Sequence, residues 1–351
     1  MTRVVILHAY SAYNRGDGLL VDAALRFVRE ACGGSLSIAL IAREPGTFQG
    51  QGAEALGGPT RIRFIPELPK LWRAIRRSDL VIGVGGGYAR GPKPMPLLKF
   101  LVGHSWQMVL AWPRRARAVY LPQSVGPFPS WLWPVLRRFY GGIRYAAVRD
   151  DRSLRDLQLD PSRRVPDSAI LDMPDREPGA DARPLAPVVF TARAVDSDAM
   201  GLLTELADRL GVFDGYIQSA TLGNDDTPVM EQLGVRRMLG SEELLGSSAS
   251  PRVVIAVRLH AALMAIEAGH YVVHLAYERK GFGAFDDLGL AEYCHNVNRF
   301  SVDDVSKQAH ALLTSSEARR SYDEKINDRL RTVRAQRANL VSHLGEAVTC
   351  R

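Results

Sequence analysis

The sequence has few cysteines and no long uninterrupted apolar segment. Its three cysteines, Cys32, Cys294 and Cys350, are odd in number and lack metal-site spacing. They argue against a disulfide framework and against a structural zinc site. The most membrane-like stretch, residues 97–112, is interrupted by Lys99 and other polar residues and is too short to span a bilayer.

The N-terminus lacks the features of a secretory signal. Its apolar run is short and passes into polar residues by position 11, without a longer apolar core or a cleavage site of small residues. No recognised nucleic-acid-binding module accompanies the pI of about 9.4. We therefore expect a soluble, cytoplasmic protein that does not bind nucleic acid.

Acidic residues are scarce in one region. Residues 61–117 contain 12 Lys and Arg against 2 Asp and Glu, and all five tryptophans lie in or just after this region. Residues 1–178 hold 26 basic and 15 acidic residues, whereas residues 179–351 hold 19 and 23, so net charges of +11 and −4 give the total of +7. Basic residues mixed with aromatics suit peripheral contact with the anionic inner face of a membrane. The alternative is a solvated basic face over core tryptophans.

The 351 residues and the 46% hydrophobic content suffice for two domains. Short apolar runs alternate with helical patterns, which predicts parallel sheets covered by helices on both faces. In the first half, strands are predicted at residues 4–9, 36–42, 61–65, 80–84, 118–121 and 145–148, with a helix from Leu19. In the second half, strands are predicted at residues 188–191, 216–219, 253–257 and 271–276, and helices at 202–210, 229–233 and 259–268.

Residues 171–187, rich in Asp, Pro, Arg and Gly, are interpreted as an interdomain linker. The fold class is therefore α/β, with one Rossmann-like domain in residues 1–178, a second in 179–351, and a helical tail after Phe300. Ligands of such sheets bind beyond the carboxyl ends of the strands, where candidate site residues are expected.

Three predicted strand ends in the first half carry polar or glycine-rich loops. Asn14 and Asp17 flank a glycine before the first helix, and Asp17 either caps that helix or binds a substrate hydroxyl. Gly86 and Gly87, within a run of three glycines, either line a cleft or form a tight turn. Further along the chain, sugar hydroxyls could hydrogen-bond to two adjacent polar side chains, Gln123 and Ser124.

The remaining candidates are mainly cationic. Arg149 follows a strand and could clamp a carboxylate or phosphate, or form an ion pair with Asp150 or Asp151. Arg258 and His260 are two apart where a buried strand enters an apolar helix, so they can converge on an anion near the positive helix N-terminus. Histidine can also transfer a proton near neutral pH. Lys280 is a second phosphate candidate, with Arg279 a near-equal rival.

Seven segments, in order, resemble the signatures of polysaccharide pyruvyl transferases: NRGD, GGG, LPQSVGPF, VRDDRS, VPDSA, RLHAALMAIEAG and YERKGFG. The resemblance covers roughly residues 4 to 290. It implies a GT-B-like arrangement of two Rossmann-like domains, no metal or other cofactor, and transfer of pyruvate from phosphoenolpyruvate to two saccharide hydroxyls as a cyclic ketal. One departure is His270-Tyr271 after Gly269, where the family often has Gly-x-Pro.

Carried onto this chain, the resemblance implies donor-site roles for Arg149, Arg258 and His260, with Lys280 as a further candidate. Domain 179–351 would hold the donor and domain 1–178 the saccharide acceptor, which could be lipid-linked. The alternative is a GT-B-type glycosyltransferase with a nucleotide-sugar donor, in which Glu267 could contact the ribose. A third hypothesis for the function is a non-catalytic sugar-binding protein. The sequence leaves the acceptor, the ketal stereochemistry and the oligomeric state open.

Overall fold

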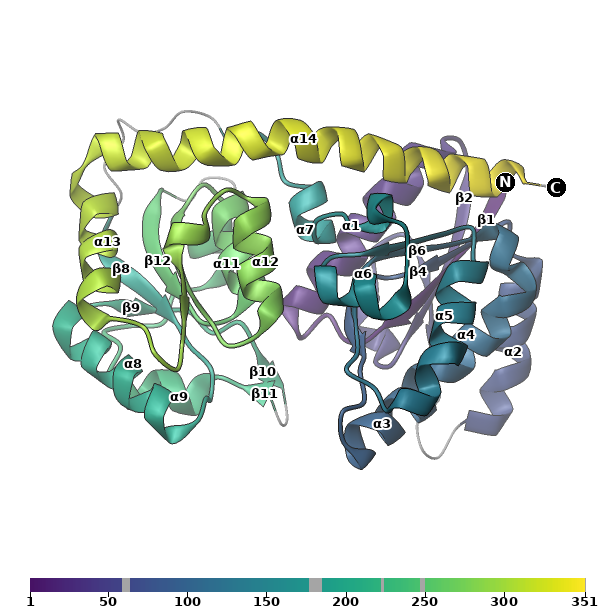
Figure 1. The fold of residues 1–351 in the computed structure, drawn as a ribbon, viewed down its shortest axis with the longest axis horizontal. Helices are drawn as coiled ribbons and strands as arrows, with labels where there is room; N and C mark the ends of the chain where they lie inside the picture. The colour runs from purple at the N-terminus through teal and green to yellow at the C-terminus, as the bar shows by residue number, and fades with distance from the viewer. Residues whose placement is uncertain (59–63, 177–184, 222–223, 247–249, 351) are drawn as a thin grey trace. The chain divides into compact units, whose positions relative to one another are not determined.

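The computed structural model describes residues 1–58, 64–176, 185–221, 224–246 and 250–350 (Figure 1). The chain forms two compact units. The first comprises Met1–Tyr13, Asp17–Asp172 and Val333–Arg351, and the second comprises Asn14–Gly16 and Met173–Thr332. The predicted boundary between residues 178 and 179 lies outside the described residues.

The first unit is built on a seven-stranded sheet in the order β3-β2-β1-β4-β6-β5, with β7 also paired to β6. All its pairings are parallel. Most of its strands are apolar and buried, as parallel sheets require, whereas β3 is only partly buried. They are β1 (Thr2–Ala9), β2 (Leu36–Ala42), β3 (Glu54–Gly57), β4 (Leu80–Gly83), β5 (Gly86–Ala89), β6 (Ala118–Val125) and β7 (Tyr145–Val148).

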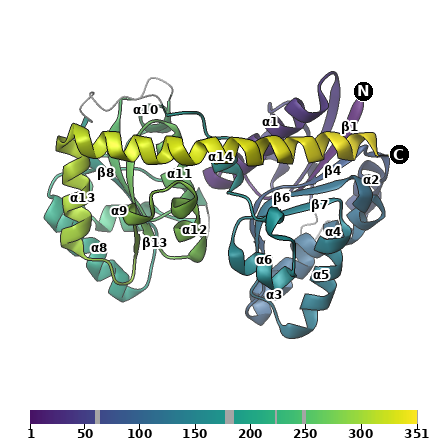
Figure 2. The ribbon, with the colours of Figure 1, turned by 45° about the horizontal axis from the view of Figure 1, so that its top comes forward.

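Helices cover both faces of this sheet. Helix α1 (Arg15–Cys32) lies on one face, and α2, α4 and α5 lie on the other (Figure 2). The apolar residues of α1 recur at helical spacing, so one side of the helix is buried against the sheet. The remaining helical bounds are α2 (Phe64–Arg77), α3 (Pro94–Phe100), α4 (Trp106–Ala111), α5 (Trp133–Gly142), α6 (Asp151–Leu157) and α7 (Ser168–Leu171). Short 3-10 turns are Pro45–Phe48, Trp112–Arg117, Ser130–Leu132 and Pro161–Arg163, and Leu101–Ser105 is a π-helical turn.

The predicted strand at residues 61–65 lies mostly outside the described residues, and its described part is helical. Residues 61–63 lie outside the described part of the chain, and residues 64–65 begin helix α2. The strand expected there is β3, a few residues earlier, whose residues are exposed or only partly buried. An apolar-run criterion fails for such an edge strand because its side chains are not buried.

The second unit contains a five-stranded parallel sheet in the order β14-β13-β12-β8-β9. Its strands are β8 (Leu185–Thr191), β9 (Asp214–Gly215), β12 (Arg252–Ala256), β13 (Tyr271–Ala276) and β14 (Cys294–Asn296), and a separate antiparallel hairpin pairs β10 (Ala220–Thr221) with β11 (Asn224–Asp225). Because every strand of the main sheet runs parallel, all their carboxyl ends lie at one edge.

Helices of the second unit are α8 (Ser197–Leu210), α9 (Thr227–Gln232), α10 (Ser241–Leu245), α11 (Leu259–Glu267), α12 (Arg279–Asp287) and α13 (Val302–Thr314), with a 3-10 turn at Ala291–Tyr293. The strand predicted at residues 216–219 is wrong: β9 comes two residues earlier, and residues 216–219 form a loop. That loop is buried nevertheless, which is why its composition resembles a strand.

The predicted helical tail is confirmed as α13 followed by α14 (Ser316–Thr349). Buried residues recur along α14 at spacings of three, four and seven, which gives one apolar stripe: Tyr322, Ile326, Leu330, Val333, Leu340, Leu344 and Ala347. Its residues up to Thr332 group with the second unit and those from Val333 with the first.

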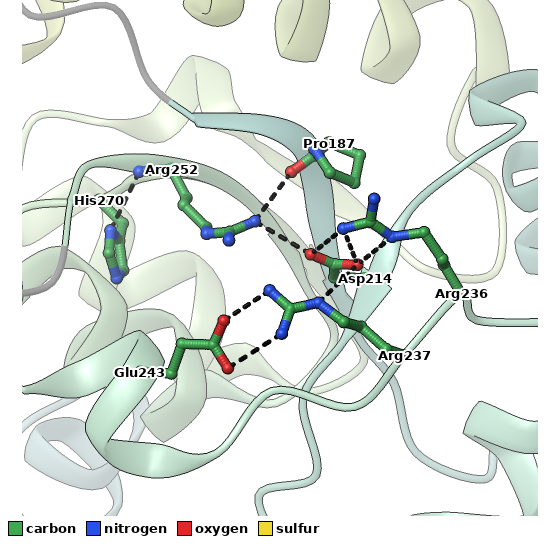
Figure 3. A network of polar contacts seen from close by, with 7 residues as sticks. All are labelled: Pro187, Asp214, Arg236, Arg237, Glu243, Arg252 and His270. Carbon is green, nitrogen blue, oxygen red and sulfur yellow. Dashed lines mark hydrogen bonds and ion pairs between the residues drawn. The ribbon is translucent and has the colours of Figure 1, made fainter.

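A buried ion network anchors the amino-terminal part of the second sheet (Figure 3). The Asp214 carboxylate accepts hydrogen bonds from Arg236 Nε at 2.8 Å and Nη2 at 3.0 Å, and from Arg252 Nη1 at 3.1 Å. Arg237 lies 3.7 Å from the same carboxylate and pairs with the exposed Glu243. A fully buried carboxylate is tolerated here because several guanidinium groups surround it.

Candidate active site

The carboxyl edge of the second sheet carries a buried arginine–aspartate pair. Arg258 is the N-cap residue of α11, directly after β12. Its Nε donates to Asp226 Oδ2 at 2.6 Å and its Nη2 to Oδ1 at 2.5 Å. Both side chains are buried. This bidentate contact fixes the plane of the guanidinium group at the N-terminus of a nine-residue helix.

A second arginine, which sequence reasoning missed, lies at the same edge. Arg193 follows β8, donates from Nη1 to the Tyr277 hydroxyl at 2.9 Å, and stacks over that ring at 4.8 Å. Burial raises the pKa of the Asp226 carboxyl, and the hydrogen bonds and charge of Arg258 and the charge of Arg193 oppose that rise. Asp226 therefore offsets only part of the positive charge that the two guanidinium groups provide.

His260 lies in the first turn of α11, two residues after Arg258, as the spacing predicted. Its side chain is partly buried and its Nε2 atom is buried. Gly16 belongs to the same unit, and a Cβ added there would lie 2.4 Å from Nδ1 of His260. The absence of a side chain at Gly16 therefore makes room for the histidine ring.

Lys280 lies in the first turn of α12, beyond the end of β13. Its Nζ pairs with Glu278 Oε2 at 2.9 Å, and its side chain retains 24% exposure. Arg279 begins the same helix. Parallel pairing thus brings Arg193, Arg258, His260 and Lys280 to one edge of one sheet.

Further buried polar atoms at this edge have no hydrogen-bond partner within the described residues. They are Thr191 Oγ1 at the end of β8, and Tyr216 hydroxyl and Gln218 Oε1 in the loop after β9. Buried polar groups are normally satisfied, so such a cluster is typical of a ligand site. Polar residues in a loop that follows a strand's carboxyl end are the sequence feature that could have predicted them.

In the first unit, Arg149 is buried immediately after β7. Its Nε donates to Ser124 Oγ at 3.0 Å, and its Nη1 pairs with Asp167. Asp150 and Asp151 were the predicted alternative ion-pair partners of Arg149, but the observed partner is Asp167. Asp150 instead caps α6, accepting from Ser153 N at 2.9 Å.

Asp167 connects Arg149 to a helix start. Its carboxylate accepts from Ala169 N at 3.0 Å and caps α7. Gly87 lies near the guanidinium group, because a Cβ there would lie 3.4 Å from Nη2 of Arg149. The VRDD, LPQS, VPDS and GGG segments therefore meet at Arg149, although they are far apart in sequence.

Gln123 and Gly86 are in the interior next to this cluster. Gln123 is fully buried, donates to the Tyr88 hydroxyl at 2.5 Å and accepts from the Tyr140 hydroxyl at 2.7 Å. Gly86 opens β5 with φ of +133°, which disfavours other residues. Asn14 accepts from Gly16 N at 3.3 Å, and Asp17 lies in the first turn of α1, where a negative charge is favourable.

A histidine–tyrosine cluster at the end of β1 was not anticipated. His8 has a left-handed φ of 71°, stacks on Tyr88 at 4.5 Å, and shares a hydrogen bond of 3.1 Å with the Tyr120 hydroxyl. His104 stacks on the same Tyr88 ring at 4.6 Å. Burial lowers the pKa of His8, and burial together with the nearby Arg43 charge lowers the pKa of His104 to about 4. Both rings are therefore neutral near pH 7.

A model of the family described as polysaccharide pyruvyl transferase matches residues 14–279, more than half of the chain. The chain belongs to the polysaccharide pyruvyl transferase family. Membership indicates a transferase and implies a polysaccharide acceptor. The matched range includes Arg149, Arg258 and His260 but ends before Lys280. Comparison with curated proteins yields no match.

Solved structures show the fold. An α,α-trehalose 6-phosphate synthase from Burkholderia multivorans has a TM-score of 0.53 and 11% identity, covering 99% of each chain. A UDP-forming α,α-trehalose-phosphate synthase from Burkholderia vietnamiensis has a TM-score of 0.51 and 13% identity, covering 99% of this chain and 100% of that one. A Thermobaculum terrenum O-GlcNAc transferase mutant also scores 0.51 at 13% identity, covering 99% and 68%. These similarities confirm the predicted GT-B-like α/β fold.

The described residues contain no group of three or more His, Cys, Asp or Glu side chains that could hold a metal ion. Within the same residues, no helix combines the length and apolarity needed to cross a membrane. The three cysteines are free thiols.

Proposed function

We propose that this chain transfers pyruvate from phosphoenolpyruvate to two hydroxyl groups of a saccharide, forming a cyclic ketal. The observation that carries the proposal is the convergence of Arg258, Arg193 and the α11 N-terminus at the carboxyl edge of the second sheet. Phosphoenolpyruvate has a carboxylate and a phosphate on adjacent positions, and guanidinium forks bind both groups well. Family membership supports the same donor class.

Each arginine in the second unit has a distinct proposed role. Arg258, held in plane by Asp226, would bind the phosphate near the positive end of α11. Arg193, oriented by Tyr277, would bind the carboxylate. Lys280 is the further phosphate candidate, after exchange of its contact with Glu278. These cations would also stabilise phosphate as it leaves.

His260 is proposed to supply the proton transfer. Protonation of the methylene carbon converts it to a methyl group and makes the adjacent carbon electrophilic. One saccharide hydroxyl adds to that carbon and loses its proton, and the carbon–oxygen bond to phosphate then breaks. The second hydroxyl then adds to the same carbon and also loses its proton. Of the two protons that the hydroxyls release, one replaces the proton given to the methyl group, and the other leaves with phosphate. Phosphoenolpyruvate is a substrate in this scheme, and no cofactor takes part.

The first unit is proposed to contact the saccharide. Ser124 accepts a hydrogen bond from Arg149, which keeps its predicted role as an anion-binding residue. Asp17, Gly86, Gly87 and Gln123 of this unit, and Asn14 of the second unit, remain proposed acceptor or cleft-lining residues. Of these, Gln123 would act through the Tyr88 and Tyr140 hydroxyls that hold it.

A thermal-shift titration tests the donor assignment. Phosphoenolpyruvate, UDP-glucose and GDP-mannose are each added to wild type, Arg258→Ala and Arg331→Gln. Arg331 is the matched control, because it is an exposed arginine of the same unit, at 75% side-chain exposure. A ligand at 100 times its Kd stabilises the folded state by about 2.7 kcal/mol. We expect phosphoenolpyruvate to raise the Tm of wild type and Arg331→Gln and not of Arg258→Ala. Stabilisation by a nucleotide sugar alone would replace this proposal with a glycosyltransferase.

A further inference from the structure

The first unit contains a helical segment with apolar side chains on two sides. One side is buried in the core and the other is exposed. The segment runs through α3, the π turn Leu101–Ser105, α4 and the turn Trp112–Arg117. Its buried side includes Phe100, Met108 and Ala111. Its outer side exposes a second set of large apolar residues, Met95, Leu98, Leu101, Val102 and Val109. A helix apolar on both sides is unusual at a protein surface that faces only water.

Helix α5 and the turn before it add a second exposed apolar pair. Trp131 is 62% exposed and Val135 is 61% exposed, and their spacing of four places them on one helical side. Inward-facing residues of α3, α4 and α5, namely Phe100, Met108, Leu136 and Phe139, belong to one hydrophobic core, so these helices cover the same face of the sheet. Tryptophan prefers membrane interfaces because its ring is apolar and its N–H is polar.

The charge along this part of the sequence has one sign. Between Asp79 and Asp150 the sequence contains no acidic residue. The same 70 positions contain ten Lys and Arg, of which the exposed ones are Arg90, Lys93, Lys99, Arg115 and Arg138. Lys93 and Lys99 lie close in sequence to the exposed Met95 and Leu98. An apolar surface that also carries anionic groups would complement this combination of side chains.

We propose that the face formed by residues 90–117 and 130–138 docks on an anionic lipid bilayer. The exposed aliphatic residues and Trp131 would enter the boundary between head groups and acyl chains, and the basic residues would pair with anionic head groups. This mode of binding needs no membrane-spanning helix. It is independent of the donor chemistry, and it would give the chain access to lipid-linked saccharides.

Vesicle flotation of the full chain tests the proposal. Vesicles contain phosphatidylcholine alone or phosphatidylcholine with 30% phosphatidylglycerol, at low and at high salt. We expect binding to the anionic vesicles at low salt, weaker binding at high salt, and little binding to neutral vesicles. Val109→Glu should reduce anionic-vesicle binding at least tenfold. Val212→Glu is the matched control, because Val212 is 63% exposed in the second unit, against 70% for Val109.

Charge variants separate the two contributions. Lys93→Gln combined with Lys99→Gln should weaken anionic-vesicle binding about 30-fold. Each basic side chain near such a surface raises the binding affinity roughly sixfold. Lys307→Gln, at an exposed position of the second unit, should have no effect. Circular dichroism and Tm confirm that each variant folds.

Three results would overturn the proposal. The first is negligible binding to both vesicle types under all salt conditions. The second is undiminished binding by Val109→Glu while it stays folded. The third is a wild-type chain that does not bind vesicles but self-associates with rising concentration in sedimentation velocity, when Val109→Glu abolishes this self-association. The face would then contact a second copy of the chain. None of these readouts depends on turnover.

Discussion

At the residue scale, the proposed anion-binding arginines are held in place by side-chain partners. Asp226 holds Arg258, Asp167 holds Arg149, and the Tyr277 hydroxyl and ring hold Arg193. A guanidinium group fixed before the ligand arrives loses less conformational entropy on binding. The partner carboxylates were outside the predicted site because they come from loops distant in sequence, so the spacing along the chain contained no signal for them.

Arg193→Gln is expected to raise the KM for phosphoenolpyruvate about tenfold or more, since a hydrogen bond to a charged group contributes roughly 1.5–3 kcal/mol. Tyr277→Phe removes only the hydroxyl that orients Arg193 and should have a smaller effect. Steady-state kinetics with varied phosphoenolpyruvate measures both. An unchanged KM in Arg193→Gln would remove this residue from the donor site.

His260→Asn is expected to lower kcat roughly 10²- to 10⁴-fold, the range that general acid–base catalysis contributes. Affinity for phosphoenolpyruvate should change little, because the proposed clamp is formed by Arg258 and Arg193. Rapid-quench single-turnover rates together with the thermal shift separate the two effects. Wild-type turnover in this variant would exclude His260 as the proton-transfer group.

At the element scale, the arginine network around Asp214 holds β9 and β12 at the amino-terminal part of the second sheet (Figure 3). Asp214→Asn leaves buried guanidinium charge without its counter-ion, and should lower the unfolding free energy by about 3–5 kcal/mol. Urea denaturation of the variant measures this loss. Glu243→Gln removes only a pair in which both side chains are at least 40% exposed, so its cost should stay within about 1 kcal/mol. Equal losses in the two variants would contradict this account.

His270, at the turn between α11 and β13, predicts an acid-dependent loss of stability. Its Nδ1 accepts from Arg252 N at 3.1 Å and its Nε2 donates to Leu244 O, so the ring is neutral. Burial lowers the pKa of His270 to about 4. The charges of Arg176 and Arg252 act in the same direction, whereas the hydrogen bond to Leu244 opposes the shift. The unfolded value is about 6.5, so the unfolded state binds more protons between these values.

The unfolding free energy should therefore fall as pH drops from about 6.5 towards 4, by roughly 3 kcal/mol from His270 at most. His270→Gln can retain both hydrogen bonds without a titrating group, and should show a shallower decline. Urea denaturation at several pH values between 7 and 4 compares the two proteins. Parallel pH curves would show that His270 does not contribute.

The same turn is held by an arginine from a distant part of the chain. Gly269 adopts φ of +87° and Arg176 donates to the carbonyls of Gly269 at 3.0 Å and His270 at 2.8 Å. Arg176 thus satisfies carbonyl groups at the end of α11, while Asp323 pairs with its guanidinium group. This contact between residues more than 90 positions apart could not be predicted from the local sequence.

At the scale of the whole molecule, the strand–helix alternation, the parallel sheets and the helical tail could be predicted because they depend on local apolar patterns. The exposed strand β3 could not be predicted, because it lacks a buried apolar run. The strand expected at 216–219 was wrong because a buried loop has the apolar composition of a strand. Arg258 and His260 were found because one strand end joins them. Arg193 was missed because only the parallel pairing of β8 with β12 brings it to that edge, and Asp226 was missed because it follows β11, which lies outside that sheet.

The measurement that tests the central claim most directly is mass spectrometry of a library of oligosaccharides after incubation with the chain and phosphoenolpyruvate. The account predicts products heavier by one pyruvate minus one water, one phosphate released per product, and loss of both in His260→Asn. Parallel reactions contain UDP-glucose or GDP-mannose in place of phosphoenolpyruvate. Products heavier by one hexose from those donors, with no pyruvylated product from phosphoenolpyruvate, would contradict it.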